Sequence, residues 1–176
     1  MSEPGSGEAV VSEESEGLRG IKERFGEALL AAEEADGELR LTVAAGRLTA
    51  LCAYLRDEPI LAFDYPADLT ARDTGEQLIL WYRLVSIAHN RTALLHVELS
   101  RENPAVASVT SIWPGLNWFE RECFDLFGIR FPGHPDDGDP ARMRILLPED
   151  WEGHPFRRDY EPVFSGDPLH GPQERN

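Results

Sequence analysis

Apolar residues recur at helical spacing in two stretches of the first third of the chain. Residues 47–56 place apolar side chains at i, i+3, i+4 and i+7, so Cys52 is expected to be a core residue. Residues 18–34 carry one apolar face of the same period, made of Leu18, Ile21, Phe25, Ala28, Leu29 and Ala32. We therefore predict a helix over each stretch, with the Asp36-Gly37 pair as the turn that ends the first.

Four further stretches have the pattern of strands. Residues 38–43 alternate polar and apolar side chains, and residues 60–69 form a run that Pro66 breaks or bulges. Residues 77–88 form a long apolar run with aromatic and β-branched residues, residues 92–99 form the next strand-like run, and the tight connection between them predicts a hairpin. Helices and strands are segregated, so the fold class is expected to be α+β: a two-layer domain with a mixed sheet and flanking helices, followed by an extended C-terminal arm.

A third helix is expected from Asn117 onward. Asn117 has the chemistry of an N-cap, Glu120 fits a capping box three residues later, and Gly128 has the chemistry of a stop. Arg121 and Asp125 are expected to pair at i, i+4 on the polar side of this helix. The apolar stripe on its other side consists of Phe119, Cys123, Leu126 and Phe127.

The carboxylates of this helix raise the possibility of acid–base chemistry. Glu120 and Glu122 are two residues apart and do not face each other on a helix, and Asp125 is expected to pair with Arg121. Spacing therefore favours a solvated or partner-facing helix side over a catalytic cluster. Cys123 lies on the apolar stripe and is expected to be a buried thiol.

The last part of the chain, residues 129–176, is rich in proline and arginine and repeats the phrase Gly-His-Pro. Proline presets an extended backbone and lowers the entropy that a segment loses on docking. The arm has too few apolar residues to fold alone, so we expect it to lie on a surface. Its arginines are predicted to contact an acidic surface of a partner: Arg142, Arg144, Arg157 and Arg158.

Composition limits the function further. The formal net charge of -15 argues against nucleic-acid binding. No apolar run reaches the roughly 20 residues of a membrane span, and residues 1–17 form an acidic stretch that we expect to be a disordered tail without signal-peptide character. Cys52 and Cys123 lie far apart, so this chain alone cannot hold a four-thiolate iron–sulfur cluster. A cytoplasmic, prokaryotic protein fits best.

Metal sites are weakly signalled. The run Asp136-Asp137-Gly138-Asp139 lacks the further ligands of a calcium loop. His134 and His154 have no further ligands that the spacing nominates. The remaining alternative of this kind is an independent metal-dependent enzyme that uses His134, Asp136 and His154.

The order of several motifs resembles one family. Glu120-Arg121-Glu122, Asp125-Leu126-Phe127-Gly128-Ile129, the two Gly-His-Pro phrases, Arg144-Ile145-Leu146 and Arg157-Arg158-Asp159 are similar to the C subunit of proton-pumping NADH-quinone oxidoreductase, the thirty-kilodalton subunit family of respiratory complex I. The resemblance covers roughly residues 18–162. Asp137 to Ala141 looks inserted relative to the family pattern, which leaves the local docking geometry open.

The resemblance implies a structural role. Such a protein has no catalytic residue and no cofactor or metal of its own, and it belongs to the peripheral arm on the cytoplasmic side of the bacterial cell membrane. It would dock on the quinone-pocket subunit and the iron–sulfur subunits of a complex that uses NADH, FMN, iron–sulfur clusters and quinone, with membrane association through that complex. The expected docking residues are Glu120, Arg121, Glu122, Asp125, His134, Arg144, His154, Arg157, Arg158 and Asp159.

The predicted organisation is then a tail at 1–17, an α+β domain like that of the thirty-kilodalton family at 18–128, and a docking arm with its tail at 129–176. One alternative stays open, in which the chain has the same structural role in a different complex. The chain could be the equivalent component of a membrane-bound hydrogenase or another complex-I-like oxidoreductase with a different electron donor.

Overall fold

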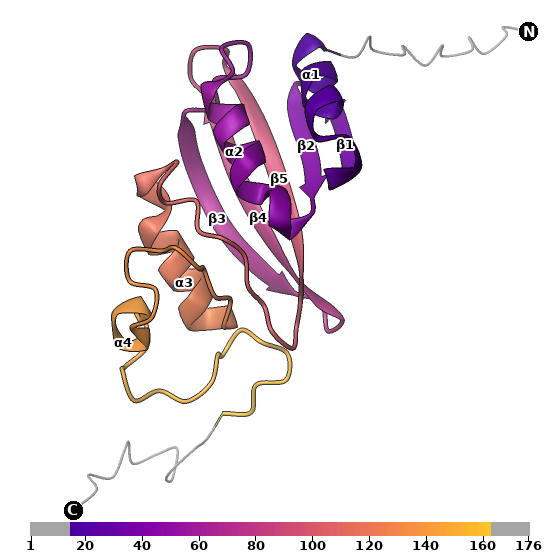
Figure 1. The fold of residues 1–176 in the computed structure, drawn as a ribbon. Helices are drawn as coiled ribbons and strands as arrows, with labels where there is room; N and C mark the ends of the chain where they lie inside the picture. Colours follow the sequence, from indigo (N-terminus) through magenta and orange to yellow (C-terminus); the bar gives the residue numbers. More distant parts are fainter. Residues whose placement is uncertain (1–14, 163–176) are drawn as a thin grey trace, which may run out of the picture.

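A five-stranded mixed sheet forms the centre of the protein (Figure 1). The computed structural model describes residues 15–162. In the sheet the strand order is β1-β2-β5-β4-β3; β2 and β5 run parallel, and the other neighbouring pairs are antiparallel. The strands are β1 (Leu29–Ala35), β2 (Glu38–Val43), β3 (Tyr65–Asp73), β4 (Gln77–Ser86) and β5 (Arg91–Ser100).

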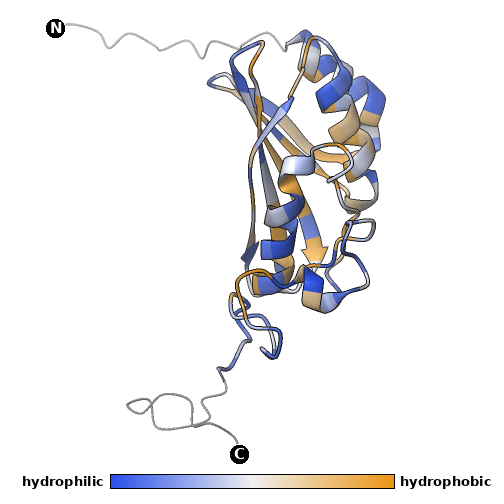
Figure 2. Cartoon of the chain, turned by 90° about the vertical axis from the view of Figure 1, so that its left-hand side faces the viewer, coloured by the Kyte–Doolittle hydropathy of each residue, from blue (hydrophilic) through white to orange (hydrophobic). Residues whose placement is uncertain are grey.

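Three helices pack on one face of this sheet: α1 (Glu16–Phe25), α2 (Leu48–Asp57) and α3 (Asn117–Phe127). Side chains alternate along each strand, so Leu41, Leu95, Tyr82 and Leu69 line up across four strands and are buried beneath the helices. The helices lie to one side of the sheet in Figure 2. The predicted α+β class with a mixed sheet and flanking helices is confirmed.

The opposite face of the sheet is only partly covered. Trp81 of β4 stacks on His96 of β5 there, with 4.8 Å between ring centroids, and more than a third of the Trp81 side chain stays exposed. The pairing register places these two residues directly opposite each other on antiparallel strands. Ring stacking therefore takes the place of helix packing on this face.

The prediction of one long first helix is wrong in its second half. Helix α1 begins at Glu16, where the Ser15 hydroxyl accepts a hydrogen bond from the Leu18 N–H, and it ends at Gly26, whose positive φ of 38° stops the helix. A short 3-10 turn, η1 (Gly26–Ala28), then leads into β1. The Ala- and Glu-rich stretch of β1 has helical period, but pairing with β2 through the Asp36-Gly37 hairpin turn overrides that propensity.

The remaining body follows the sequence pattern more closely. Helix α2 follows the 3-10 turn η2 (Ala45–Arg47), and its four predicted apolar positions are all buried, Cys52 included. Strand β3 starts at Tyr65, because residues 59–61 form a turn, and its register shifts between Pro66 and Asp68 where the break was expected. The hairpin of β4 and β5 is confirmed.

Helix α3 ends as predicted but does not begin as predicted. It continues from the 3-10 turn η3 (Pro114–Leu116), and no side chain caps its first turn, so the capping box of Asn117 and Glu120 is wrong. At the other end Gly128 adopts the left-handed conformation with φ of 75° and donates its N–H to Phe124 O.

The arm lies on its own body. Residues 104–108 and 130–132 run side by side through three backbone hydrogen bonds of 2.9–3.0 Å and the parallel bridge of Ala105 with Arg130. Phe131 and Met143 are buried, and a short helix, α4 (Pro140–Met143), is capped by Asp139. The segment that looked inserted, Asp137 to Ala141, thus supplies the cap and first residues of α4.

The predicted tail falls mostly outside the described residues, as does the chain after residue 162. Among residues 15–162, no helix combines the length and apolar character needed to cross a membrane.

Candidate functional site

The carboxylate of Asp125 joins the arm to helix α3. It is fully buried, and its Oδ2 accepts hydrogen bonds from the backbone N–H groups of Ile145, Leu146 and Leu147 at 2.8–3.1 Å. Its Oδ1 lies 2.7 Å from the Arg144 guanidinium. Burial acts to raise the pKa of Asp125, but these hydrogen bonds to the charged form outweigh it and the pKa is lowered. The predicted pair of Arg121 with Asp125 is therefore wrong.

Arg121 has a different partner. Its guanidinium donates to Arg144 O at 2.7 Å, across from α3 to the arm. Arg144 in turn donates to Trp151 O at 2.8 Å. Arg121 and Arg144 thus hold the backbone of the arm against the helix, through contacts between residues 23 and 19 positions apart that helix periodicity could not reveal.

The first Gly-His-Pro turn fixes the start of α3. His134 is buried; its Nε2 donates to Asn117 O at 3.2 Å, while its Nδ1 accepts from the Asp136 N–H at 3.0 Å. Gly133 supplies the positive φ of 88° that turns the chain just before the histidine. Both ring nitrogens are thus used by backbone groups.

The second Gly-His-Pro turn fixes the end of α3. His154 Nδ1 donates to Asp125 O at 2.9 Å, and the Phe156 N–H donates to Leu126 O at 3.0 Å. These two carbonyls belong to the last turn of the helix, where no intrahelical donor remains for them. A Cβ on Gly128 would lie 2.6 Å from the His154 ring, so the glycine that ends the helix also makes room for this turn.

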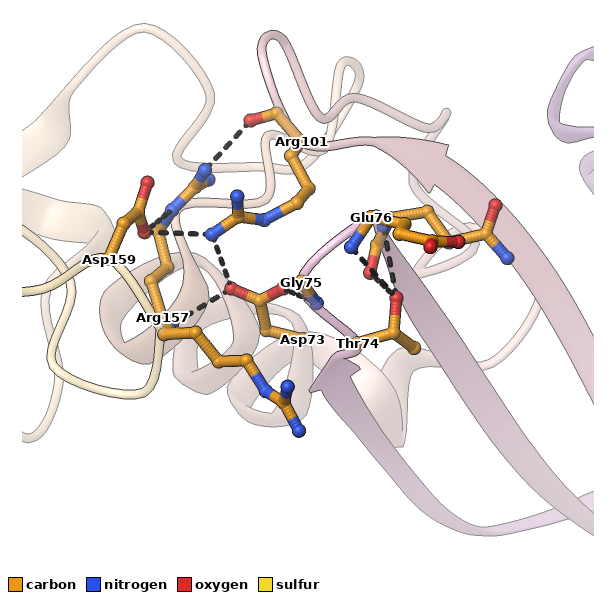
Figure 3. Close-up of polar contacts among 9 residues, drawn as sticks. Asp73, Thr74, Gly75, Glu76, Arg101, Arg157 and Asp159 are labelled. Atoms are coloured by element: carbon orange, nitrogen blue, oxygen red, sulfur yellow. Dashed lines mark hydrogen bonds and ion pairs between the residues drawn. The ribbon is translucent and has the colours of Figure 1, made fainter.

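A second buried carboxylate, Asp73, joins the arm to the end of the sheet (Figure 3). It accepts from the Arg101 guanidinium and the Arg158 N–H, both at 2.9 Å, and from the Gly75 N–H at 2.8 Å. Burial raises the pKa of Asp73, but the Arg101 hydrogen bond and then the two backbone donors outweigh it and lower the pKa to about 2. The sequence indicated only a turn here.

The same cluster continues into the arm. Arg101 also lies 3.0 Å from Asp159, which pairs with Arg157 at 3.2 Å, and Arg157 donates to Arg101 O at 2.9 Å. Figure 3 shows the Arg101 guanidinium between Asp73 and Asp159. The arm is therefore attached at a second place, through residues 157–159 rather than the backbone that Asp125 binds.

Glu120 points into the interior of this chain. It is fully buried between α3 and the loop before it, and its Oε1 accepts from the Val109 N–H at 2.8 Å. Its other oxygen has no hydrogen-bond partner among the described residues. Burial raises the pKa of Glu120 to about 7, although hydrogen bonds from Ser108 and Val109 act in the opposite direction.

The ten residues expected to dock on partners therefore divide into two groups. Those that the structure engages within the chain and covers largely or partly are Glu120, Arg121, Asp125, His134, Arg144, His154 and Arg157. Glu122 is partly covered, and Arg158 and Asp159 are exposed. Docking through these residues stays a prediction.

Exposed apolar side chains of the arm are a feature that sequence reasoning missed. Leu146 is 58% exposed, Phe156 59% and Trp151 39%, and Trp118 on α3 is 69% exposed. Each backbone position in the arm is tied to the end of α3 or to Arg144: Leu146 N–H to Asp125, Trp151 O to Arg144, and Phe156 N–H to Leu126. The only sequence signal was the presence of large apolar residues in a segment without periodicity.

The candidate metal ligands and thiols among residues 15–162 lie apart from one another or are buried. This part has no group of three or more His, Cys, Asp or Glu side chains placed to hold a metal ion. His134 and His154, considered together for a metal enzyme, lie at opposite ends of α3. Cys52 and Cys123 are buried, and burial raises the pKa of both thiols.

Comparison with known proteins defines the class. Residues 41–164 match the family described as Respiratory-chain NADH dehydrogenase, 30 Kd subunit, and the chain belongs to this family. The family accordingly contributes a subunit to an enzyme complex of the respiratory chain. The C subunit of NADH-quinone oxidoreductase from Roseiflexus castenholzii is 41% identical over 136 residues, covering 76% of this chain and 75% of the relative.

Solved structures share the fold. A trypsin-resistant fragment (1–134) of Nqo5 superimposes with a TM-score of 0.56 and 27% identity, covering 67% of this chain and 96% of the fragment. A chain of an archaeal respiratory membrane complex, the membrane-bound sulfane sulfur reductase, gives a TM-score of 0.69 at 20% identity and covers 83% of this chain and 84% of its own. At that identity the likeness is one of fold.

Proposed function

We propose that this chain is a non-catalytic structural subunit of the peripheral arm of a proton-translocating NADH-quinone oxidoreductase. It docks on the quinone-pocket subunit and the iron–sulfur subunits on the cytoplasmic side of the bacterial membrane. Electron transfer from NADH to quinone is carried out by the assembled complex, and this chain binds no cofactor of its own. Family membership supports the assignment to the complex, and the geometry of the arm supports the docking role.

The observation that carries the proposal is an arm with a fixed backbone and exposed apolar side chains. Exposed apolar residues gathered on one part of a surface are typical of protein interfaces. Leu146 and Phe156 are each more than half exposed, yet their N–H groups are bonded to Asp125 and Leu126 of α3. Because the backbone is already ordered, docking these side chains costs little conformational entropy.

The experiment compares two pairs of exposed apolar residues. Leu146→Ser with Phe156→Ser alters the arm, whereas Leu30→Ser with Ile87→Ser alters side chains of similar exposure, 61% and 67%, on β1 and after β4. A tagged full-length chain is expressed in its host, and the co-purifying iron–sulfur subunits are quantified from solubilised membranes. The arm pair is expected to lower their recovery about tenfold or more, as for loss of interface anchors.

Two results would count against the proposal. Recovery of the tagged wild-type chain without any other subunit would remove the assembly role. Equal recovery with the two pairs would remove the arm as the docking surface. NADH-dependent quinone reduction by the same membranes follows assembly and gives an independent reading.

The electron donor distinguishes the alternative complex. The fold is shared with the membrane-bound sulfane sulfur reductase, so the fold does not select the donor. Identity of 41% to a component of NADH-quinone oxidoreductase favours NADH. Mass spectrometry of the purified complex decides: a flavin-bearing NADH-oxidising subunit supports the proposal, and a nickel-ligating large subunit supports a hydrogenase-type complex.

A further inference from the structure

The arginines of the arm are largely committed to contacts within the chain. Arg144 binds Asp125 and Trp151 O, and Arg157 binds Asp159 and Arg101 O. Arg142 has Asp136 at 3.6 Å. A partner surface selected by these side chains would have to compete with existing ion pairs. The fourth arginine, Arg158, is exposed and its guanidinium forms no ion pair within residues 15–162, so contact of the arm with an acidic partner surface stays a prediction.

The unpaired charged side chains that line one groove of the arm are carboxylates. A groove of about 570 Å³ lies between the turn after β5 and the last part of the arm. Its two arginines, Arg101 and Arg157, are paired with Asp73 and Asp159. Three further carboxylates line the groove, and within residues 15–162 they form no ion pair or side-chain hydrogen bond: Glu102, Glu152 and Glu161.

The groove has a second feature that suits a cation. The ring of Tyr160 lines it and is held beside Gly153, where a Cβ would lie 2.9 Å from the ring. The face of an aromatic ring attracts a guanidinium or ammonium group. His154 also lines the groove. Its pKa is lowered, mainly by burial, so it adds little positive charge at neutral pH.

The walls of the groove are fixed before any partner arrives. Asp73 Oδ2 accepts from both the Arg101 guanidinium and the Arg158 N–H, and Arg157 donates to Arg101 O. A charged groove with an ordered floor contributes to the choice of partner and to the rate of encounter through electrostatic complementarity.

We propose that this groove receives an arginine- or lysine-bearing segment of a neighbouring subunit, with the cationic side chain among Glu102, Glu152 and Glu161 and beside Tyr160. The proposal rests on the proposed function, because it specifies the chemistry of the partner at the docking surface. It reverses the sign of the charge that the arm was expected to recognise.

The test uses the tagged full-length chain in its host complex and a triple charge reversal, E102K/E152K/E161K. The matched control is E23K/E27K/E33K, which reverses three exposed carboxylates on α1, η1 and β1, far from the arm (Figure 1). The groove triple is expected to reduce co-purification of the other subunits about tenfold or more, and the control to stay within about twofold of wild type, because like charges at an interface are strongly unfavourable.

A second variant covers the case in which the reversed chain fails to fold. E102Q/E152Q/E161Q removes the charge without repulsion and is expected to reduce assembly about threefold, as for partly exposed ion pairs. Wild-type assembly is also expected to weaken as salt is raised from about 50 to about 500 mM, and the Gln triple to lose that dependence.

The outcomes separate this inference from the proposed function. If wild type assembles and both groove triples assemble as well as the control, the groove is not the contact, and the structural role stands. If wild type itself does not assemble, the proposed function fails first. Loss of wild-type assembly on addition of EDTA, restored by a divalent cation, would assign the carboxylates to a metal ion and overturn the basic segment.

Discussion

Different interactions stabilise the body of this protein and hold its arm in place. In the body, leucines such as Leu51, Leu80 and Leu95 are fully buried between the sheet and helices, and apolar area removed from water supplies the stability. In the arm few side chains are buried, and its course is set by the carboxylates Asp125 and Asp73 and the backbone donors around them. The body is therefore expected to tolerate apolar substitutions of similar volume. The attachment of the arm depends instead on two carboxylate side chains.

The substitution expected to have the largest effect on the arm alone is Asp125→Ala. It leaves the largely buried Arg144 guanidinium without its carboxylate and three N–H groups without an acceptor, a change expected to cost about 3–5 kcal/mol. The cost falls on the attachment of the arm. Native-state hydrogen exchange should show loss of protection at the amides of Leu146 and Leu147 with little change at Leu80; uniform loss over both regions would contradict the separation.

The matching change in the body is Leu80→Ala. Leu80 lies in the middle of β4 and is fully buried, so truncation is expected to cost about 2–5 kcal/mol through lost burial and the cavity left behind. Urea unfolding should report a global loss, because the sheet carries the core that the arm also rests on. The control, Ile87→Ala at a 67% exposed position, should change stability by less than about 0.5 kcal/mol. A Leu80 variant that loses arm protection alone would reverse the assignment.

The comparison is sharpened by pH. Because the pKa of Glu120 is raised from 4.5 to about 7, the folded chain binds more protons there than the unfolded chain, and its contribution to stability falls as pH rises from about 4.5 to 7. Asp125, with a lowered pKa, acts in the opposite direction: its contribution is present above its ordinary pKa of 3.8 and is lost as pH falls.

Glu120→Gln keeps an acceptor for the Val109 N–H and removes the titration. It is expected to match wild type near pH 4.5 and to be more stable above pH 7 by up to about 3 kcal/mol, because the pKa rises from 4.5 to about 7 on folding. Urea unfolding across pH gives the measurement. If the stability difference between Gln and Glu stays constant from about pH 4.5 to about pH 8, the buried carboxyl does not titrate in this window.

Local chemistry predicted much of the body but little of the site. The i, i+3, i+4, i+7 spacing of α2, the hairpin of β4 with β5 and the stop at Gly128 depend on neighbours in sequence, and all three are confirmed. Residues 29–35 are rich in Ala and Glu, which favour a helix, and only pairing with β2 decides for a strand. The partner of Asp125 lies nineteen residues away, beyond the reach of any helical spacing rule.

The arm also shows what charge composition leaves undetermined. A count of arginines indicated a surface that seeks acids, because pairing cannot be read from composition. Arg144 and Arg157 are paired with carboxylates of their own chain, and the unpaired charged side chains that line the groove of the arm are carboxylates, whereas the exposed Arg158 guanidinium forms no ion pair within residues 15–162. Family resemblance identified the motifs but did not reveal that most of them hold this chain to itself.

The two histidine turns have a consequence for chain length. His134 is bonded to the first residue of α3 and His154 to its last turn, so the helix fixes the separation of the two turns whatever the chain between them does. Asp137 to Ala141 lies in that interval, where it forms a turn and the start of α4. Residues can therefore be added or removed between Asp137 and Ala141, before the residues that bind Asp125, without changing where the arm meets α3, which makes this short stretch the place where insertions and deletions are best tolerated.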